Sequence, residues 1–252
     1  MKQENRNSSI FVFGTRAVIE AVNSGRELEK VYIQKGLKNE LVHELQRTLN
    51  EFKVPFLFVP AEKINKVAGY RNHQGVAAIL SSVSYQNIEN ILPRVFEEGR
   101  TPLLLVLDRI TDVRNFGAIC RSAECMGVDA VIIPSRGAAQ ISSDAIKTSA
   151  GALHKIAVCR SENLKATLTF LKESGLQIVS CTEKSEKNCY ECDLTVPTAL
   201  ILGSEEDGIS EEYLKRSDVS VKIPLRGEIG SLNVSVAAGI ILYEAQRQRI
   251  GS

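Results

Sequence analysis

A series of short, continuously apolar runs in the second half of the chain constrains the fold most strongly. Runs of this length suit parallel strands covered on both faces. They recur as LLLVLD (103–108), AVIIP (130–134), KIAVC (155–159), QIVSC (177–181), ALILG (199–203) and VSVKIP (219–224). Helical patterns separate several of them, at 116–126, 161–174 and 210–216. This alternation predicts an α/β, doubly wound parallel sheet of about six strands, in which ligands bind at the carboxyl ends of the strands.

The front of the chain repeats the alternation on a smaller scale. Short apolar runs at 31–34, 56–59 and 75–80 alternate with helical segments at 39–52 and 61–69, which predicts a small α/β sandwich. Residues 81–102 are polar, carry two prolines and hold one short helical pattern between Ile88 and Glu98. We therefore expect two domains, 8–83 and 101–252, joined by a linker at 84–100.

Composition and charge exclude some classes of protein. The chain is 44% hydrophobic and 24% charged, as in ordinary globular proteins. No apolar run approaches the ~18 residues of a membrane span, and the first residues lack the apolar core of a signal peptide, so we expect a cytoplasmic protein. Residues 1–83 carry a net charge of +4 and residues 84–252 carry −3. This difference favours an anionic partner for the front domain, with ordinary surface charge as the alternative.

The cysteines predict neither a disulfide framework nor a metal site. Six cysteines are scattered over a long chain without secretory features, so we expect reduced thiols. Cys189 and Cys192 form a single CxxC, without a second pair and without metal-ligand spacing among the three histidines. The six are Cys120, Cys125, Cys159, Cys181, Cys189 and Cys192.

The first loop that follows a predicted strand is LDRITDVRNFGAICRSAECMG (107–127). Asn115 is a plausible N-cap for the helix that follows. Gly117 and Arg121 are four residues apart and share a stripe away from the buried face. An ordinary strand–helix unit with a surface arginine is the alternative. Several polar residues nevertheless follow the carboxyl end of the strand, where a ligand is expected. They are Asp108, Asp112, Arg114, Asn115 and Arg121.

The second loop, LILGSEEDGIS (200–210), resembles a phosphate loop only in part. Gly203 and Gly208 have the GxxxxG spacing, but Ile209 stands where the phosphate loop requires Lys. The three carboxylates at 205–207 would repel a triphosphate, and no predicted strand is followed by GxGxxG. The loop favours a ligand with hydroxyls, amines or a positive centre, with an acidic surface turn as the alternative.

The third loop leads into the last helix, in VKIPLRGEIGSLNVSVAAG (221–239). Ser231 is well placed to cap that helix, but capping does not explain Asn233, which lowers helix propensity in the first turn. Val236, Ile240 and Tyr243 line one face and other apolar residues cover the rest, so we expect a largely buried helix. Its polar N-terminal turn suits an anion or a carbonyl.

Together, TDVRNFGAICRSAE, ILGSEEDGIS and IPLRGEIGSLNVSVAAGIILYE resemble, in order and spacing, the three motifs of the SpoU (TrmH) family of RNA ribose 2′-O-methyltransferases. The front domain resembles that family's auxiliary RNA-binding domain, which is similar to ribosomal protein L30e. VFGTRAV (12–18) and NHQGVAAIL (72–80) carry this second resemblance. The two resemblances cover nearly the whole chain apart from its first few residues.

The resemblance implies a homodimeric enzyme that uses S-adenosyl-L-methionine to methylate RNA. It also implies a trefoil knot in the C-terminal domain, with the chain end passing through a loop of the sheet. Short connections without knots are the general rule, so periodicity alone would not predict this feature. The resemblance places the adenine and ribose of the cofactor against Leu202, Gly203, Ile223, Leu225, Ser231 and Leu232.

The resemblance also assigns catalytic roles. Arg121 would activate the ribose 2′-hydroxyl, either as a base or by fixing the adjacent phosphate. Because family members are homodimers, the resemblance also allows Arg121 to act across the dimer interface. We favour phosphate fixation, because a free guanidinium is effectively always protonated. Asn115 would orient Arg121 and the RNA. Glu205, Ser231 and Asn233 would hold the catalytic loops and the substrate ribose.

Two positions depart from the family pattern, and three substrates or functions remain open. Val113 stands where the family usually has Pro, and Glu206 stands where Gly is usual. The front domain favours a guanosine of 23S rRNA as the substrate. The alternatives are a tRNA ribose methyltransferase and a non-catalytic RNA-binding member of the fold, against which the intact set of Asn115, Arg121 and Asn233 argues.

Overall fold

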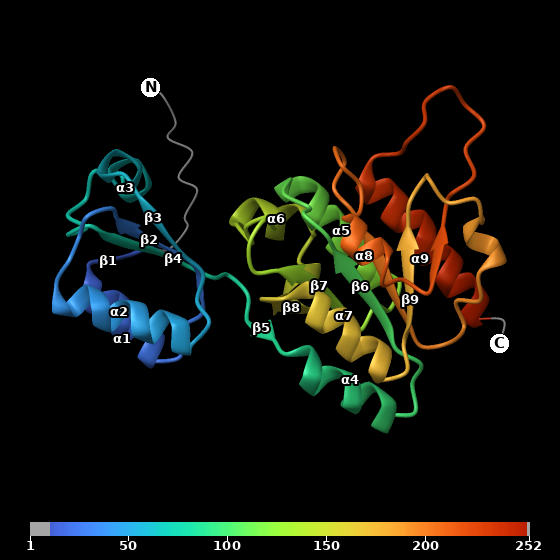
Figure 1. Cartoon of the computed structure of the whole chain (residues 1–252), viewed down its shortest axis with the longest axis horizontal. Helices are drawn as coiled ribbons and strands as arrows, with labels where there is room; N and C mark the ends of the chain where they lie inside the picture. The colour runs from blue at the N-terminus through green and yellow to red at the C-terminus, as the bar shows by residue number, and fades with distance from the viewer. Residues whose placement is uncertain (1–10, 251–252) are drawn as a thin grey trace. The chain divides into compact units, whose positions relative to one another are not determined.

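The computed structural model describes residues 11–250, which form two compact units (Figure 1). The first unit extends to Ser84 and includes Ile141–Ser143, and the second holds the rest of the chain. Within residues 11–250, no helix is both long and apolar enough to span a membrane.

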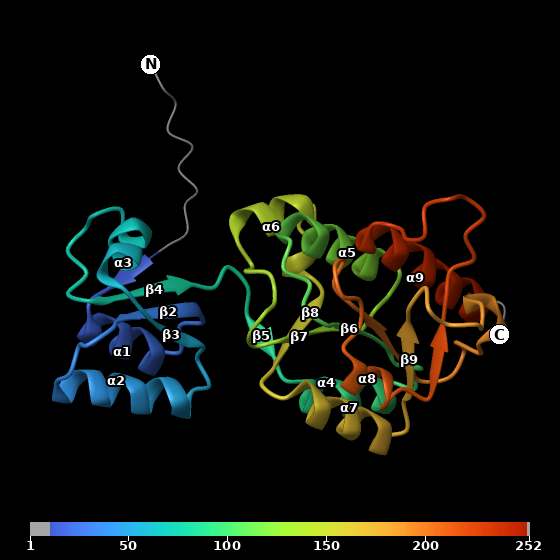
Figure 2. The same ribbon diagram turned by 45° about the horizontal axis from the view of Figure 1, so that its top comes forward.

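The first unit is the predicted small α/β sandwich. Its mixed sheet has the order β1-β4-β2-β3, with β2 parallel to β3 and β4 antiparallel to both of its neighbours. Helices α1 and α2 cover one face and α3 the other (Figure 2). The elements are β1 (Phe11–Phe13), α1 (Thr15–Asn23), β2 (Leu28–Gln34), α2 (Glu40–Glu51), β3 (Phe56–Val59), α3 (Ala61–Ala68) and β4 (Val76–Leu80).

The second unit is built on a parallel sheet with the strand order β11-β9-β10-β6-β7-β8-β5. All six predicted strands are present. The additional strand, β5, has two residues and lies at the edge of the sheet, within the segment expected to be a linker. The strands are β5 (Tyr85–Gln86), β6 (Leu103–Leu107), β7 (Ala130–Pro134), β8 (Ala157–Ser161), β9 (Gln177–Cys181), β10 (Thr198–Leu202) and β11 (Val219–Val221).

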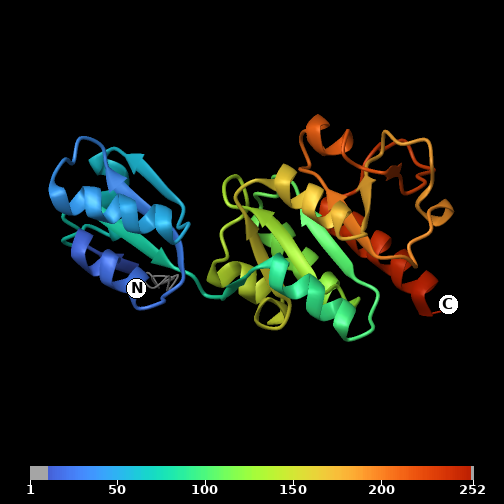
Figure 3. The same ribbon diagram turned by 60° about the horizontal axis from the view of Figure 1, so that its bottom comes forward.

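Helices cover both faces of this sheet, which explains why its central strands are apolar throughout. On one face lie α4 (Ile88–Glu97), α7 (Leu164–Glu173) and the short α8 (Glu211–Leu214); α4 (teal) and α7 (gold) are in front in Figure 3. Leu104 and Val106 of β6 pack toward them. The other face carries α5 (Val113–Cys125), α6 (Ser143–Thr148) and α9 (Val234–Ile250), seen above the sheet in Figure 2.

The two helices of the predicted site begin at residues other than those expected. Asp112, not Asn115, caps α5, because its carboxylate accepts hydrogen bonds from the backbone N–H groups of residues 114 and 115. Val113 is therefore the first helical residue, a position that tolerates Pro and many other residues. Asn233, not Ser231, caps α9, because its side-chain oxygen accepts from the backbone N–H of Ser235 at 2.9 Å.

The expectation of a largely buried last helix is wrong for one face of α9. Val236, Ile240 and Tyr243 are 50%, 38% and 60% exposed, whereas Val234, Ala238, Ile241, Leu242 and Ala245 are buried. The helix packs against α5 and the sheet on one side only. An apolar pattern all around a helix indicates that every face can be buried. The pattern does not say whether the same chain or another molecule covers each face.

Candidate active site

Residues 203–210, which follow β10, form a compact acidic loop. Ser204 and Gly208 close it by exchanging two backbone hydrogen bonds, of 3.2 and 3.0 Å. A Cβ atom at Gly203 would overlap the backbone of Gly208 and Ile209. The close approach of two chain segments therefore requires the glycine. Glu206, the departure from the family pattern, is not among the residues with positive φ, so its side chain causes no backbone strain.

Asp108 and Arg109, at the end of β6, anchor the acidic loop. Asp108 is 2% exposed, and its carboxylate accepts hydrogen bonds from the backbone N–H and the hydroxyl of Ser210, both at 2.7 Å. The Arg109 guanidinium donates to Asp207 at 2.9 Å and to the carbonyl of Gly208 at 3.1 Å. Arg109 has a φ of 58°, which is uncommon outside glycine. Sequence analysis missed Arg109, although its place directly after a strand was a usable signal.

Three predicted catalytic residues from three separate segments of the chain meet in one hydrogen-bond network. Glu205 Oε1 accepts from Asn115 Nδ2 at 3.0 Å, from Asn233 Nδ2 at 2.7 Å and from the backbone N–H of Val234 at 3.4 Å. Asn233 Nδ2 also donates to Asn115 Oδ1 at 3.1 Å. The carboxylate lies at the N-terminus of α9, where the helix dipole favours a negative charge. The network holds the acidic loop, α5 and α9 in one arrangement.

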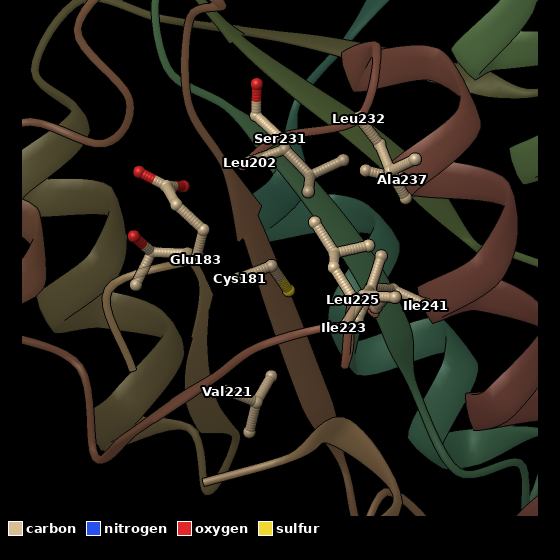
Figure 4. Close-up of a pocket in the computed structure, with 11 residues that line it drawn as sticks. Cys181, Glu183, Leu202, Val221, Ile223, Leu225, Ser231, Leu232, Ala237 and Ile241 are labelled. Carbon is tan, nitrogen blue, oxygen red and sulfur yellow. The ribbon is translucent and has the colours of Figure 1, made fainter. Parts of the chain in front are cut away.

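Five of the predicted cofactor residues line one pocket beside this network. The pocket lies between the carboxyl ends of β9, β10 and β11 and the first turns of α9 (Figure 4). The predicted residues are Leu202, Ile223, Leu225, Ser231 and Leu232. A cavity of about 510 Å³ runs on from there past Gly203, Glu205 and Asn233. Small-molecule sites typically measure about 300–1,000 Å³. Four predicted cofactor residues, Leu202, Gly203, Ser231 and Leu232, thus line the same cavity as the predicted catalytic residues Glu205 and Asn233.

The segment after β9 also lines the pocket, and sequence analysis missed it. Cys181, Thr182 and Glu183 contribute to the wall, together with Val221, Ala237 and Ile241. Burial raises the pKa of the Cys181 thiol, which keeps this part of the wall uncharged. Figure 4 shows Glu183 and Ser231 toward one end of the pocket and Val221 toward the other. The rule that ligands bind where parallel strands end applies to β9 as well and would have found these residues.

Two predicted catalytic residues lie outside the network. Arg121 is on the exposed face of α5, and within residues 11–250 its guanidinium forms no hydrogen bond or ion pair. Ser231 lines the pocket but has no hydrogen-bond partner within the same part of the chain. The structure therefore brings Asn115, Glu205 and Asn233 together and leaves Arg121 and Ser231 available to other molecules.

The cysteines are free thiols. Cys189 and Cys192, the pair with CxxC spacing, are buried, and this burial raises the pKa of both thiols. In the part of the chain that the structure describes, no group of three His, Cys, Asp or Glu side chains is arranged to hold a metal ion.

Comparison with protein families matches both units. Residues 102–243 match the model of the SpoU rRNA methylase family, and residues 11–86 match the model described as RNA 2′-O ribose methyltransferase substrate binding. The first range contains the Asn115, Glu205 and Asn233 network together with the pocket.

Individual relatives agree with the family models. A Staphylococcus epidermidis protein assigned to the TrmH family of tRNA/rRNA methyltransferases is 33% identical over 240 residues, which cover 95% of this chain and 96% of that protein. The crystal structure of the SpoU methyltransferase AviRb from Streptomyces viridochromogenes, in complex with the cofactor AdoMet, is similar with a TM-score of 0.62 and 26% identity. The match covers 96% of this chain and 91% of that one.

A third relative matches a smaller share of the chain. The A. aeolicus TrmH/SpoU tRNA modifying enzyme is 34% identical with a TM-score of 0.56, and the match covers 65% of this chain and 84% of that one. The similarity to AviRb and the two family models confirm the predicted fold class, an α/β parallel sheet that follows a small α/β unit in the chain. The trefoil knot stays a prediction. The chain belongs to the SpoU (TrmH) family of RNA 2′-O-ribose methyltransferases.

Proposed function

We propose that this protein transfers a methyl group from S-adenosyl-L-methionine to a ribose 2′-hydroxyl of ribosomal RNA. The observation that carries the proposal is the hydrogen-bond network of Asn115, Glu205 and Asn233, of which Glu205 and Asn233 line the same cavity as the predicted cofactor residues Leu202, Gly203, Ser231 and Leu232. Residues 101–252 would perform the transfer, residues 8–83 would bind the RNA, and residues 84–100 would connect the two.

The chemistry of the pocket fits this cofactor. Leucine and isoleucine side chains from the strand ends offer an apolar surface to an adenine ring, and the carboxylates of Glu183 and of the acidic loop suit hydroxyls and cationic groups. The AviRb structure holds AdoMet. S-adenosyl-L-methionine supplies a methyl group on a positively charged sulfur. The residues that would hold it are Leu202, Gly203, Ile223, Leu225, Ser231 and Leu232.

The protein's own residues would act mainly by position and charge. Glu205 and Asn233 hold the Asn115 side chain, so its second N–H is oriented before a substrate arrives. Ser231 would contact the bound ribose at the mouth of the pocket. Arg121 would fix the phosphate next to the target ribose and stabilise negative charge on the reacting oxygen, a role that suits a permanently charged guanidinium.

We also propose a homodimer that uses the exposed face of α9. Val236, Ile240 and Tyr243 form an apolar stripe on α9, and α9 packs against α5, which carries Arg121. Covering this stripe with a second copy would bring Arg121 near the partner subunit. Sedimentation equilibrium at micromolar concentration should give twice the chain mass, and Tyr243→Asp should shift the protein toward a monomer. A monomeric wild-type protein would contradict the proposal.

The finer proposal is a guanosine of 23S rRNA. The match to the tRNA modifying enzyme leaves about a third of this chain without a counterpart, whereas the front unit matches a substrate-binding model. A large RNA contains many similar riboses, among which a catalytic domain alone would select poorly. An added RNA-binding unit would supply further contacts that select the target site. The expected cytoplasmic location belongs to the same proposal. A tRNA substrate remains the alternative outcome of the test.

The test is methyl transfer from labelled S-adenosyl-L-methionine to total rRNA and, separately, to total tRNA. We expect label in 23S rRNA, and a map of 2′-O-methyl sites would identify the nucleotide. Label in tRNA alone would replace the ribosomal substrate, and no label in either RNA would overturn the enzymatic function.

Arg121→Ala should abolish transfer while the Kd for the cofactor stays nearly unchanged; retained turnover would remove Arg121 from the reaction.

A further inference from the structure

The loop that connects α3 with β4 holds an aromatic side chain in an unfavourable backbone conformation. In this loop, residues 69–75, Tyr70 has a φ of 60° and Gln74 a φ of 48°. Bulky residues rarely adopt positive φ, and two of the five non-glycine residues with positive φ in the described chain lie here. The Tyr70 side chain is 80% exposed. The exposed ring gains little packing in return for this unfavourable backbone conformation. Such a backbone outlier points to a function at the surface.

Hydrogen bonds to Asn65 of α3 hold this loop in place. The backbone N–H of Tyr70 donates to the carbonyl of Asn65 at 2.9 Å. Nδ1 of His73 accepts from the backbone N–H of Gly75 at 3.0 Å, so in the neutral ring the proton is on Nε2. That Nε2 donates to Asn65 Oδ1 at 2.7 Å. The loop is thus hydrogen-bonded to the rest of the unit at both of its ends, and the exposed Tyr70 ring extends from it.

Cationic and aromatic side chains lie around the same loop. The Arg71 guanidinium lies over the Phe13 ring, 5.9 Å from its centroid, and Phe13 stacks on Phe11 with 5.9 Å between the centroids. Phe13 also packs against the α3 side of the sheet. Lys63 and Lys66 are exposed on α3, three residues apart and therefore on one face.

We propose that Tyr70 is a stacking platform for an unpaired base of the substrate RNA, with Arg71 and Lys66 contacting the adjacent phosphates. This inference rests on the proposed function and assigns RNA recognition to one surface of the front unit. Unpaired bases in RNA loops stack on aromatic side chains and arginine planes, whereas bases inside a duplex are already stacked. The net charge of +4 over residues 1–83 suits the RNA backbone.

Binding measurements on the full-length protein test the proposal. Tyr70→Ala should weaken the Kd for a short single-stranded RNA about 5- to 150-fold, the range expected for one stacked base. Tyr70→Phe keeps the ring and should stay within about twofold of wild type. Tyr70→Asn removes the ring but tolerates positive φ, so it should show the loss without a folding defect. The same RNA as a duplex should bind more weakly to wild type and respond little to these substitutions.

A matched control comes from Phe52, an aromatic residue of the same unit that is 51% exposed just after α2. Phe52→Ala should leave RNA binding unchanged. Unchanged binding by Tyr70→Asn, or an equal loss with Phe52→Ala, would overturn the role of Tyr70. Failure of the proposed function is distinguishable, because wild type would then transfer no methyl group. If wild type methylates 23S rRNA and Tyr70→Asn does so with the same KM for RNA, only this inference fails.

Discussion

Two segments border the candidate site and are held in opposite ways. Hydrogen bonds tie the acidic loop (203–210) to Asp108, Arg109, Asn115 and Asn233. Residues 223–232, four of which line the pocket, form no hydrogen bonds within the described part of the chain, and most of them are exposed. We infer that the protein itself organises its acidic loop, whereas contacts with a bound cofactor would order the second segment.

The strongest test of this comparison is a matched pair of glycine substitutions. In Gly203→Ala the new Cβ would overlap the backbone at residues 208 and 209, and backbone cannot move aside as a side chain can. We expect the free energy of unfolding to fall by about 3 kcal/mol, the upper end for overpacking, with loss of cofactor binding. Gly227→Ala meets no atom within 4 Å and has no positive φ, so its effect should stay within about 0.5 kcal/mol. Thermal unfolding measures both, and equal effects would contradict the comparison.

A second pair of substitutions tests the anchoring network. Glu205→Gln removes the charge that strengthens three hydrogen bonds, so Asn115 and Asn233 should lose their orientation. We expect kcat to fall about 10- to 100-fold, as for a small misplacement of reacting groups, with little change in cofactor Kd. Glu206→Gln changes the neighbouring exposed carboxylate outside the network and should retain wild-type kcat. Single-turnover rates and calorimetric cofactor binding would decide, and a loss confined to cofactor affinity would refute the catalytic role of the network.

Arg109→Ala should have a smaller effect, because the bonds between Asp108 and Ser210 remain. We expect kcat to fall no more than about tenfold, on the order of one lost hydrogen bond of ordinary net strength. Arg109→Lys should recover part of this loss, since one amine can reach Asp207 or Gly208 but not both in a forked geometry. Steady-state kinetics at saturating cofactor measure the series. An increase in KM for RNA with unchanged kcat would show that Arg109 contacts RNA instead.

The smallest expected signal is a change in hydrogen exchange. Cofactor binding should slow amide exchange in residues 223–232 and leave the amides of Ser204, Asp207, Gly208 and Ser210 nearly unchanged, because these four are already hydrogen-bonded. Exchange followed by mass spectrometry, with and without S-adenosyl-L-methionine, gives the difference for each segment. Equal protection of both segments would indicate that the acidic loop, too, is organised only by the ligand.

Much of this architecture could be predicted because periodicity reports burial directly. The apolar runs predicted every long strand of the sheet, whereas β5 has two residues and leaves no recognisable pattern. The motif order identified Asn115, Glu205 and Asn233, and the structure brings these three side chains together. Their roles in catalysis remain predictions, as do those of Arg121 and Ser231.

By itself, the sequence determined which chemical groups follow each strand. Because the carboxyl ends of parallel strands lie at one edge of the sheet, it also determined that these groups gather at that edge. Only the tertiary structure decided which of these groups touch. Asp112 rather than Asn115 caps α5, and Asn233 rather than Ser231 caps α9, because a cap depends on where the backbone turns. The contacts of Arg109 likewise depend on residues nearly a hundred positions away in the chain. The exposed stripe on α9 depends on which face of the helix the rest of the chain leaves uncovered. Such contacts are set by packing in three dimensions, which local pattern does not encode.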